Sequence, residues 1–246
     1  MCFRRRTRLI FQKIFPTSFL RVIFFAFFSI ATYKKSFSAK GEDIIVNLYF
    51  KDAGISKGTY LDIGCYHPIF GSNTHLLHKT GWSGYGVDID KFKLNAMKAF
   101  RGKSITTFLG AISPSGVDGV NVPVFRFDTL WSDIDTLDEK SALATSHKFN
   151  ISFKESEIPL ININTLLESL PHINFLDIDI EGLDVSVILA MDLERFKPEV
   201  IVFEDIFKWG GSLEVKNKLE SYGYERIFLS GGSIGYAIPL KTGFIE

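Results

Sequence analysis

The stretch TYLDIGCYHP, residues 59–68, decides the fold of this chain. Its first half, residues 59–63, is a short apolar run typical of a buried strand, and Gly64 ends that run. A glycine directly after a strand lets the backbone approach a ligand closely, and a helix that begins soon afterwards offers free N–H groups. Taken alone, the pattern is as typical of an ordinary strand-to-helix turn.

Similar short apolar runs recur along the chain and alternate with helical patterns. Further strands are predicted at residues 84–87, 105–109, 173–178 and 200–203, with a terminal hairpin at 226–229 and 235–238. Helices are predicted at residues 73–79, 91–100, 183–191 and 213–222. Strands that alternate with helices indicate an α/β fold with a mainly parallel sheet and helices on both faces.

Acidic side chains follow most of these strands. They are Asp62, then Asp88 and Asp90, then the acids of 177–181, then Glu204 and Asp205. A strand interior is a costly place for an ionised carboxylate, and parallel α/β sheets bind ligands at the carboxyl ends of their strands. We therefore expect a ligand site at this edge of the sheet.

The segment GYGVDID, residues 84–90, carries the second acidic pair. An acid at the end of the second strand can accept hydrogen bonds from both hydroxyls of a ribose, which favours an adenosine-type ligand at Asp88. Asp90 is better placed to cap the following helix. The chain lacks the G-x-G-x-x-G pattern of dinucleotide sites.

The segment FLDIDIEGLD, residues 175–184, carries the densest group of acids. If the strand continues that far, its alternation places Asp177, Asp179 and Glu181 on one side. Together with Glu204 and Asp205, they could bind a divalent cation such as Mg²⁺ or supply a general base. The alternative is helix capping and solvated charge.

Four other side chains have modest signals. We expect His67 to make a local hydrogen bond in its loop, although it could act as a base. His75 and His78 lie three residues apart and could bind a metal, but a solvated helix face is the simpler interpretation. Trp82 is expected to pack in the core.

The zero net charge hides two unlike regions. Residues 1–40 hold nine basic and no acidic side chains, so the remainder holds 19 basic and 28 acidic groups, a net of −9. Residues 1–37 form a basic, apolar leader, and 38–246 form one domain with an insertion at about 113–159, a lid or an irregular surface excursion. The acidic body argues against a nucleic-acid partner.

Three interpretations of the leader stay open. It could be a helix packed on the body or lying at a membrane surface, a signal-anchor, or a cleaved signal peptide. Its uncharged run is shorter than the roughly 20 residues of a spanning helix. Two distant cysteines favour a reducing compartment, so we expect a cytoplasmic protein, peripheral to or anchored at the inner face of a membrane.

Several short motifs, taken together and in order, resemble the FkbM-type methyltransferase family. They run from Ser38 to Glu204 and comprise Ser38-x-x-Gly41-Glu42-Asp43, Asp62-x-Gly64-x-x-His67-Pro68, Ser72-Asn73-Thr74, Gly81-Trp82-x-Gly84, Asp88 and residues 176–182. The resemblance implies a class I S-adenosylmethionine (SAM)-dependent fold, with seven strands and a reversed terminal hairpin. It also implies O-methylation, commonly of sugar or polyketide-linked hydroxyls.

The resemblance also implies roles for individual residues. Asp62 and Gly64 would form the SAM loop, Asn73 would lie near the methionine end, Asp88 would hold the ribose, Ala111 would lie by the adenine and Glu42 would edge the site. Two positions depart from the family pattern: Cys65-Tyr66 stands where Ala-His is common, and Asp177 where many relatives have Lys.

These observations favour a SAM-dependent O-methyltransferase acting on a sugar hydroxyl of a glycan or glycoconjugate. Asp179 or Glu181 would orient or deprotonate the acceptor, and a divalent cation bound by Asp179, Glu204 and Asp205 could assist. The alternatives are an inactive, membrane-linked interaction protein of the same fold and an N-methyltransferase, which the absence of an amine-methylation motif disfavours.

Overall fold

The computed structural model describes residues 36–128, 132, 134–180, 182–205, 212–230 and 232–240. Its described residues form two compact units, a larger one of residues 36–121 and 159–240 and a smaller one of residues 122–158. All but the last two residues of the predicted leader lie outside the described residues. The described part of the chain contains no helix of the length and apolar character needed to cross a membrane.

The larger unit alternates strands with helices. Its strands are β1 (Thr59–Ile63), β2 (Ser83–Asp88), β3 (Ile105–Leu109), β4 (Ala111–Ser113), β7 (Phe175–Ile178), β8 (Val200–Glu204), β9 (Glu225–Ser230) and β10 (Ser233–Ala237). Its helices are α3 (Glu42–Asp52), α4 (His75–Lys79), α5 (Lys91–Arg101), α7 (Ile163–Ser169), α8 (Asp184–Ala190) and α9 (Leu213–Ser221), with a 3₁₀ turn η1 (Gly102–Ser104).

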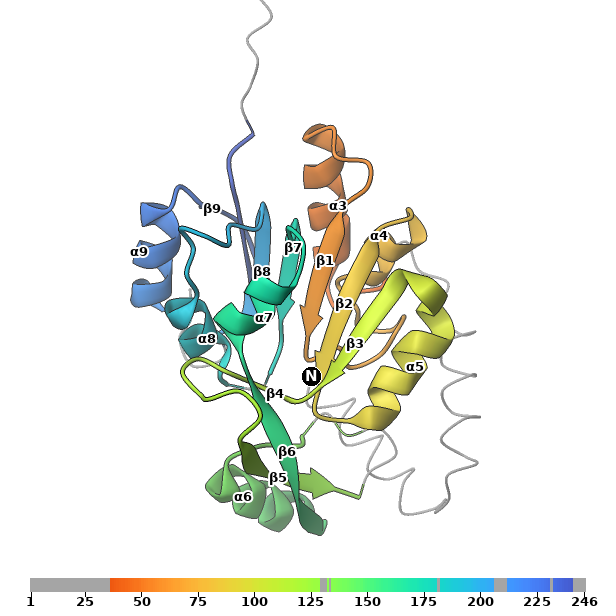
Figure 1. Cartoon of the computed structure of the whole chain (residues 1–246), viewed down its shortest axis with the longest axis vertical. Helices are drawn as coiled ribbons and strands as arrows, with labels where there is room; N and C mark the ends of the chain where they lie inside the picture. The colour runs from red at the N-terminus through yellow and green to blue at the C-terminus, as the bar shows by residue number, and fades with distance from the viewer. Residues whose placement is uncertain are drawn as a thin grey trace, which may run out of the picture. The chain divides into compact units, whose positions relative to one another are not determined.

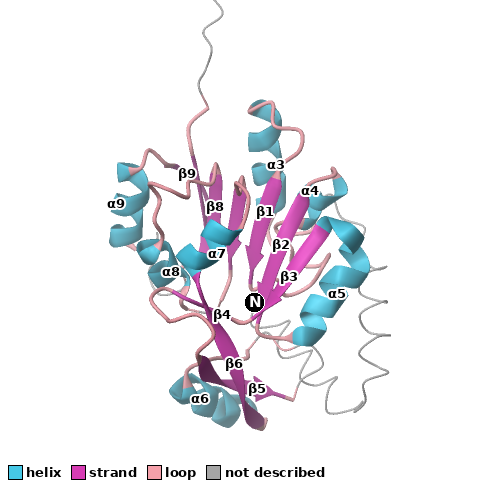
Figure 2. Ribbon diagram, in the orientation of Figure 1, coloured by secondary structure: helices cyan, strands magenta, loops and turns pink. Residues whose placement is uncertain are grey.

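Seven of these strands form one sheet in the order β3-β2-β1-β7-β8-β10-β9 (Figure 2). The first five strands are parallel, and β10 runs antiparallel to both β8 and β9. The α/β class, the mostly parallel sheet and the reversed terminal hairpin predicted from the sequence are confirmed. The chain reverses its direction of travel across the sheet at β1 and β7, which is where such sheets bind ligands.

The two faces of the sheet pack against different helices. On one face, Leu61 and Ile63 of β1 are buried in the same cluster as apolar side chains of α7, α8 and α9. On the other face, Tyr60 lies in a cluster with side chains of α3 and α4. Asp62, two residues from Tyr60, therefore points to the α3–α4 face, since side chains alternate along a strand.

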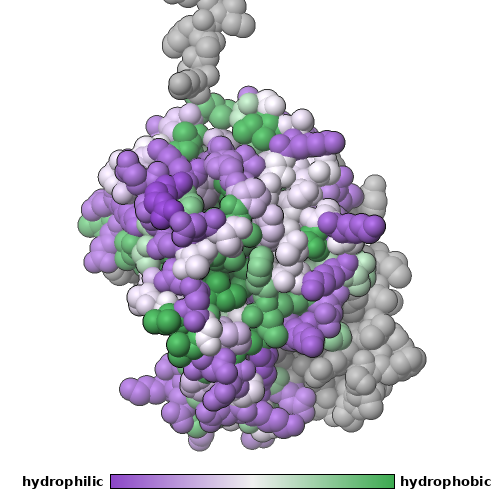
Figure 3. Space-filling model, viewed as in Figure 1, coloured by the Kyte–Doolittle hydropathy of each residue, from purple (hydrophilic) through white to green (hydrophobic). Residues whose placement is uncertain are grey.

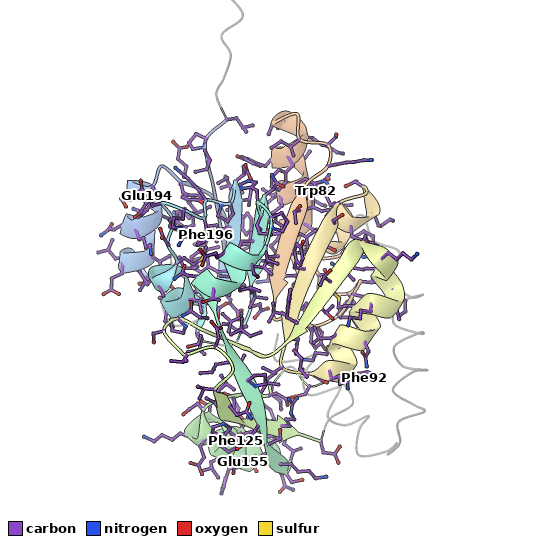
Figure 4. The ribbon with its side chains drawn as sticks, viewed as in Figure 1. Trp82, Phe92, Phe125, Glu155, Glu194 and Phe196 are labelled. Carbon is purple, nitrogen blue, oxygen red and sulfur yellow. The ribbon has the colours of Figure 1, made fainter. Side chains whose placement is uncertain are left out.

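Trp82 anchors the core on the α3–α4 side (Figure 4). Its side chain is almost fully buried, and its ring centroid lies 4.6 Å from that of Phe50 in α3. The prediction that Trp82 packs in the core is confirmed. The α3 helix itself was not predicted from the sequence, yet its burial against β1 and β7 brings its first residues to the ligand edge.

The helices are amphipathic, as the sequence pattern requires. Figure 1 shows α5 alongside β2 and β3, and α8 with α9 beside β8. On the face in Figure 3, hydrophilic residues predominate over α5 and α9. Asp90 caps α5, because its side chain accepts a hydrogen bond from the backbone N–H of Phe92 at 2.8 Å; this prediction is confirmed.

The smaller unit holds most of β5 (Asn121–Phe127) and β6 (Phe153–Asn162), with α6 (Glu139–Phe149) between them. Asp138 caps α6 by accepting a hydrogen bond from Ser141 N–H at 2.8 Å, and Asn150 ends the helix in a left-handed conformation. Phe125 and Phe127 both contact Phe153 through their rings. This unit lies within the 113–159 interval that the sequence marks as an insertion.

Candidate active site

The turn after β1 is built around Gly64. Its φ is +83°, and a Cβ atom there would overlap the backbone oxygen of Asp179. The Gly64 N–H donates to the backbone oxygen of Val87 at 2.8 Å, and the Asp179 N–H donates to that of Ile63 at 2.9 Å. Only glycine combines this conformation with this close approach, so the turn is held between the ends of β2 and β7.

Two carboxylates lie side by side next to this turn. Asp62 of β1 and Asp177 of β7 are paired across the parallel strands, and each is only 6% exposed. Asp62 accepts a hydrogen bond from the Thr74 hydroxyl, and Asp177 accepts one from the Asn73 side-chain amide at 2.9 Å. The loop before α4 therefore supplies one donor to each carboxylate.

Burial sets the protonation of this pair. Desolvation raises the pKa of Asp62, although the nearby Arg101 guanidinium opposes the rise. Desolvation raises the pKa of Asp177 well above its usual range, and the negative charge of Asp62 adds to the effect. Two adjacent carboxylates do not both ionise readily, so Asp177 is the one that keeps its proton to higher pH.

Glu42, the first residue of α3, contributes a third buried carboxylate. Its residue is 2% exposed, its Oε2 accepts the Lys40 N–H at 2.7 Å, and its Oε1 has no hydrogen-bond partner among the described residues. Its charge helps to raise the pKa of Asp177, which places it beside the pair. An unsatisfied buried oxygen is costly, so this atom is suited to a donor on a ligand.

The segment before Glu42 is held by its neighbour Asp43. The Asp43 carboxylate accepts the Ser36 hydroxyl and the Phe37 N–H, both at 2.7 Å, and the Ser38 hydroxyl at 2.9 Å. These bonds fix the start of α3 and hence the position of Glu42. Asp43 was part of a motif in the sequence but had no role assigned to it.

The end of β2 carries the acid expected to bind ribose. Asp88 is 6% exposed, and its Oδ1 accepts the Asp90 N–H at 2.7 Å. The Lys93 ammonium lies 3.9 Å from Asp88 Oδ2. Gly110 N–H donates to the Asp88 backbone oxygen at 3.2 Å, so Ala111, which is 3% exposed, follows directly beside Asp88. Lys93 was not predicted from the sequence as a partner of Asp88, because a lysine in a predicted helix gives no signal of such a contact.

The acids after β7 do not follow the predicted alternation. The strand ends at Ile178, as predicted for 173–178, so the condition under which Asp177, Asp179 and Glu181 would share one side of a continuing strand is not met. Asp177 is buried and Asp179 is exposed. Directly after the strand, the backbone of Asp179 lies against the bare Cα of Gly64. Glu181 lies outside the described residues.

Asp184 is a buried acid that the sequence did not single out. It opens α8, is 1% exposed, and accepts the N–H groups of Gly182 and Glu204 at 3.3 and 3.4 Å. Desolvation, followed by the charge of Asp179, raises its pKa to about 7. The ionisation of Asp184 is therefore coupled to the charge of Asp179, which lies in the loop after β7.

The predicted metal site of Asp179, Glu204 and Asp205 does not form within the described residues. No three His, Cys, Asp or Glu side chains gather there in a geometry that could hold a metal ion. Asp205 Oδ2 instead accepts the Ser212 N–H at 2.5 Å. Adjacent positions such as Glu204 and Asp205 point to opposite sides of an extended chain, which is why they do not converge with Asp179.

The histidines have local roles. His67 Nδ1 accepts the N–H groups of Ile69 and Phe70 at 3.1 and 2.9 Å, which confirms the predicted loop hydrogen bond. The prediction of a solvated face was wrong for His75, because its ring packs edge-on against Phe37 at 4.5 Å. Burial and the nearby cations lower the pKa of His75 to about 3.

Comparison with known proteins identifies the family. The model of the methyltransferase FkbM domain matches residues 62–226, about two thirds of the chain, from Asp62 at the turn to the start of β9. The chain belongs to the FkbM methyltransferase family. This confirms the resemblance seen in the sequence and makes the chain a SAM-dependent methyltransferase. No curated protein matches the chain.

Solved structures match the chain at low sequence identity. A TehB-like SAM-dependent methyltransferase from Corynebacterium glutamicum is 14% identical with a TM-score of 0.40, and the match covers 82% of this chain and 89% of that one. An O-methyltransferase from Bacillus cereus in complex with SAH is 9% identical with a TM-score of 0.41, covering 95% and 97%. The N-methyltransferase NodS from Bradyrhizobium japonicum is 11% identical with a TM-score of 0.38, covering 80% and 94%.

Proposed function

We propose that this FkbM methyltransferase is an O-methyltransferase whose acceptor is a sugar hydroxyl of a glycan or glycoconjugate. The observation that carries the proposal is the position of Asp179. It is an exposed carboxylate at the carboxyl end of β7, and its backbone contacts the Gly64 turn of the cofactor site. A hydroxyl is a weak nucleophile, so a carboxylate at the rim of the cofactor site suits it.

The residues present fit SAM. Gly64 leaves room for close approach where a Cβ would not, and Glu42 Oε1 is a buried acceptor in need of a donor. In the proposal, Asp62, Gly64, Asn73 and Glu42 hold the amino-acid end, while Asp88 and Ala111 hold the nucleoside. When bound, SAM supplies a methyl group carried on a positively charged sulfur.

The acidic side chains divide the remaining work. Asp179 accepts the hydrogen bond of the acceptor hydroxyl, orients its oxygen and takes its proton as the oxygen becomes a nucleophile. Asp177 is buried and accepts the Asn73 side-chain amide, so it is less accessible to an acceptor than the exposed Asp179. Because methyl transfer is an in-line displacement, holding the hydroxyl in line supplies much of the rate.

The test replaces Asp179 by Asn and measures two quantities. Transfer of labelled methyl groups to extracted glycans should fall by about 100-fold or more, the lower range of general-base contributions, while SAM affinity by calorimetry should change little. Asp52→Asn is the matched control, since Asp52 is exposed at the far end of α3. Full activity of Asp179→Asn would contradict the assignment of the base.

Sugar acceptors are tested by the same assay. Label in an alkali-stable methyl ether on the glycan would support the proposal, and label on an amine would support N-methylation instead. The reaction is run once with Mg²⁺ and once with a chelator. A requirement for Mg²⁺ would favour a cation site that includes Asp179. SAM binding without transfer to any glycan or amine would favour the inactive interaction protein.

The proposed membrane contact concerns residues 1–37. Their eight basic side chains and their many phenylalanines suit an anionic lipid surface. Deletion of residues 1–36 should move the protein out of the membrane fraction, and unchanged fractionation would contradict this contact.

A further inference from the structure

Arg101 is a buried guanidinium to which the proposed function assigns no role. It is the last residue of α5, and its side chain is 0% exposed. A buried charge is costly unless it is paired and hydrogen-bonded. Arginine at the end of a helix is common in sequences, so its residue type and position gave no signal of this environment.

Every N–H group of the guanidinium has an acceptor. Nε and Nη2 donate to the Pro68 backbone oxygen at 3.3 and 3.0 Å, and Nη2 also donates to Ser72 Oγ at 2.9 Å. Nη1 donates to the Tyr60 hydroxyl at 2.9 Å and to Thr74 Oγ1 at 2.8 Å. Five donors in a rigid fork thus tie β1 to the loop that leads into α4.

Two of these acceptors, Thr74 and Ser72, link Arg101 to the acidic pair through further hydrogen bonds. The Thr74 hydroxyl has one proton, which it donates to Asp62, so it can only accept from Arg101. Ser72 Oγ lies 3.1 Å from Thr74 Oγ1 and accepts the His75 N–H at 3.1 Å. Asn73 stands between these residues in the chain and donates to Asp177.

We propose that Arg101 is a positioning residue for the SAM site. Its hydrogen bonds hold residues 72–74 in place. Thr74 and Asn73 then present their donors to Asp62 and Asp177 in the arrangement that binds the cofactor. Arg101 does not itself touch SAM. The proposal rests on the assignment of Asp62 to the cofactor site and is independent of the acceptor.

The charge of Arg101 acts on the same pair. Its Nη1 lies 3.9 Å from Asp62 Oδ2, and it lowers the pKa of Asp62 against the effect of burial. Without this charge, Asp62 takes up a proton at higher pH. SAM affinity that depends on ionised Asp62 would then be lost at a higher pH, which a purely structural role of Arg101 would not produce.

The experiment measures SAM affinity by calorimetry in the full-length protein. Arg101→Lys keeps the charge but has three donors on one atom, so it cannot bridge the four acceptors. Arg101→Lys and Thr74→Val should each raise the Kd for SAM about tenfold or more, the effect of losing one charge-assisted hydrogen bond. The control is Arg195→Lys, an exposed arginine that donates to Glu168 at 2.5 Å.

The double variant separates positioning from general stability. If Arg101 acts through Thr74, the double variant should bind SAM about as weakly as either single variant, so the two effects are far from additive. Additive losses, or wild-type affinity of folded Arg101→Lys, would overturn the proposal. If wild-type protein itself fails to bind SAM, the cofactor assignment fails instead, which is a distinguishable result.

A pH series supplies the second readout. Arg101→Met should move the acid limb of SAM affinity to higher pH by about one unit, the effect of removing a neighbouring opposite charge. An unmoved limb in this variant would overturn the electrostatic part. Should Arg101→Met not fold, Thr74→Val decides, because wild-type affinity in that variant would equally overturn the proposal.

Discussion

Asp184→Asn tests whether a buried acid limits the stability of this protein at neutral pH. Asp184 is 1% exposed, and burial raises its pKa from 3.8 to about 7. A shift of about 3 units corresponds to roughly 4 kcal/mol of cost for ionising the carboxyl inside the folded protein. The variant keeps the shape of the side chain and removes the charge.

The sign follows from the two pKa values. The unfolded carboxyl ionises near pH 4 and the folded one near pH 7. Below pH 4 both states are protonated and the cost is absent, and it is complete only when the pH has risen through about 7. Roughly 2–3 kcal/mol of the loss should therefore fall between pH 5 and 8 in the wild type and be missing in Asp184→Asn.

Urea unfolding at pH 5, 6, 7 and 8 gives the free energy of unfolding of each protein. Asn has one acceptor oxygen where the carboxylate has two, so the variant loses one weak backbone hydrogen bond, which lowers its stability by about 1 kcal/mol at every pH. This offset cancels in the slope. Asp52→Asn, with an exposed side chain, should run parallel to wild type. Parallel curves for Asp184→Asn and wild type would refute the reasoning.

Three further changes test the Gly64 turn, the core and His75. Gly64→Ala should raise the Kd for SAM at least about tenfold, because the left-handed φ alone costs about 1–2 kcal/mol and the new Cβ overlaps the Asp179 backbone. Calorimetry measures this Kd, and unchanged affinity would mean that the turn does not bind SAM. Trp82→Ala should lower the free energy of unfolding by about 3–5 kcal/mol through cavity formation, and a loss under 1 kcal/mol in urea titration would show that the ring is not packed as described. His75→Leu should make the free energy of unfolding less sensitive to acid. The pKa of His75 is about 3 in the folded protein and 6.5 in the unfolded one, so wild type loses stability as the pH falls through 6.5. An identical loss of unfolding free energy at low pH in both proteins would contradict this.

The sequence alone was sufficient for the sheet. The strands that become β1, β2, β3, β7 and β8 are short apolar runs bounded by glycine or charge, and burial on both faces requires such runs wherever they occur. Local chemistry was equally readable at Asp90, whose short side chain before a helix is a cap in nearly any context. The family motif around Gly64 was found because a turn that tolerates only glycine leaves a trace in the residue type.

Elements whose patterns suit more than one structure were not found. The α3, α6 and α7 helices and strand β6 mix polar and apolar residues without a clear period, and contacts with distant strands decide their conformation. The end of β7 at Ile178 agrees with the strand predicted at 173–178. The alternation in FLDIDIE continues past Ile178, but the strand does not, and the backbone of Asp179 lies against Gly64.

What the sequence determined by itself is the class of fold, the ligand edge of the sheet and the acids that line it, because periodicity and turn chemistry are local properties. What only the tertiary structure decided is the state of those acids. Asp177 and Asp62 become a buried pair, Glu42 keeps an unsatisfied oxygen, and Arg101 holds the loop that serves them. The protonation and position of these side chains depend on contacts that form only after folding, and those contacts join residues far apart in the chain.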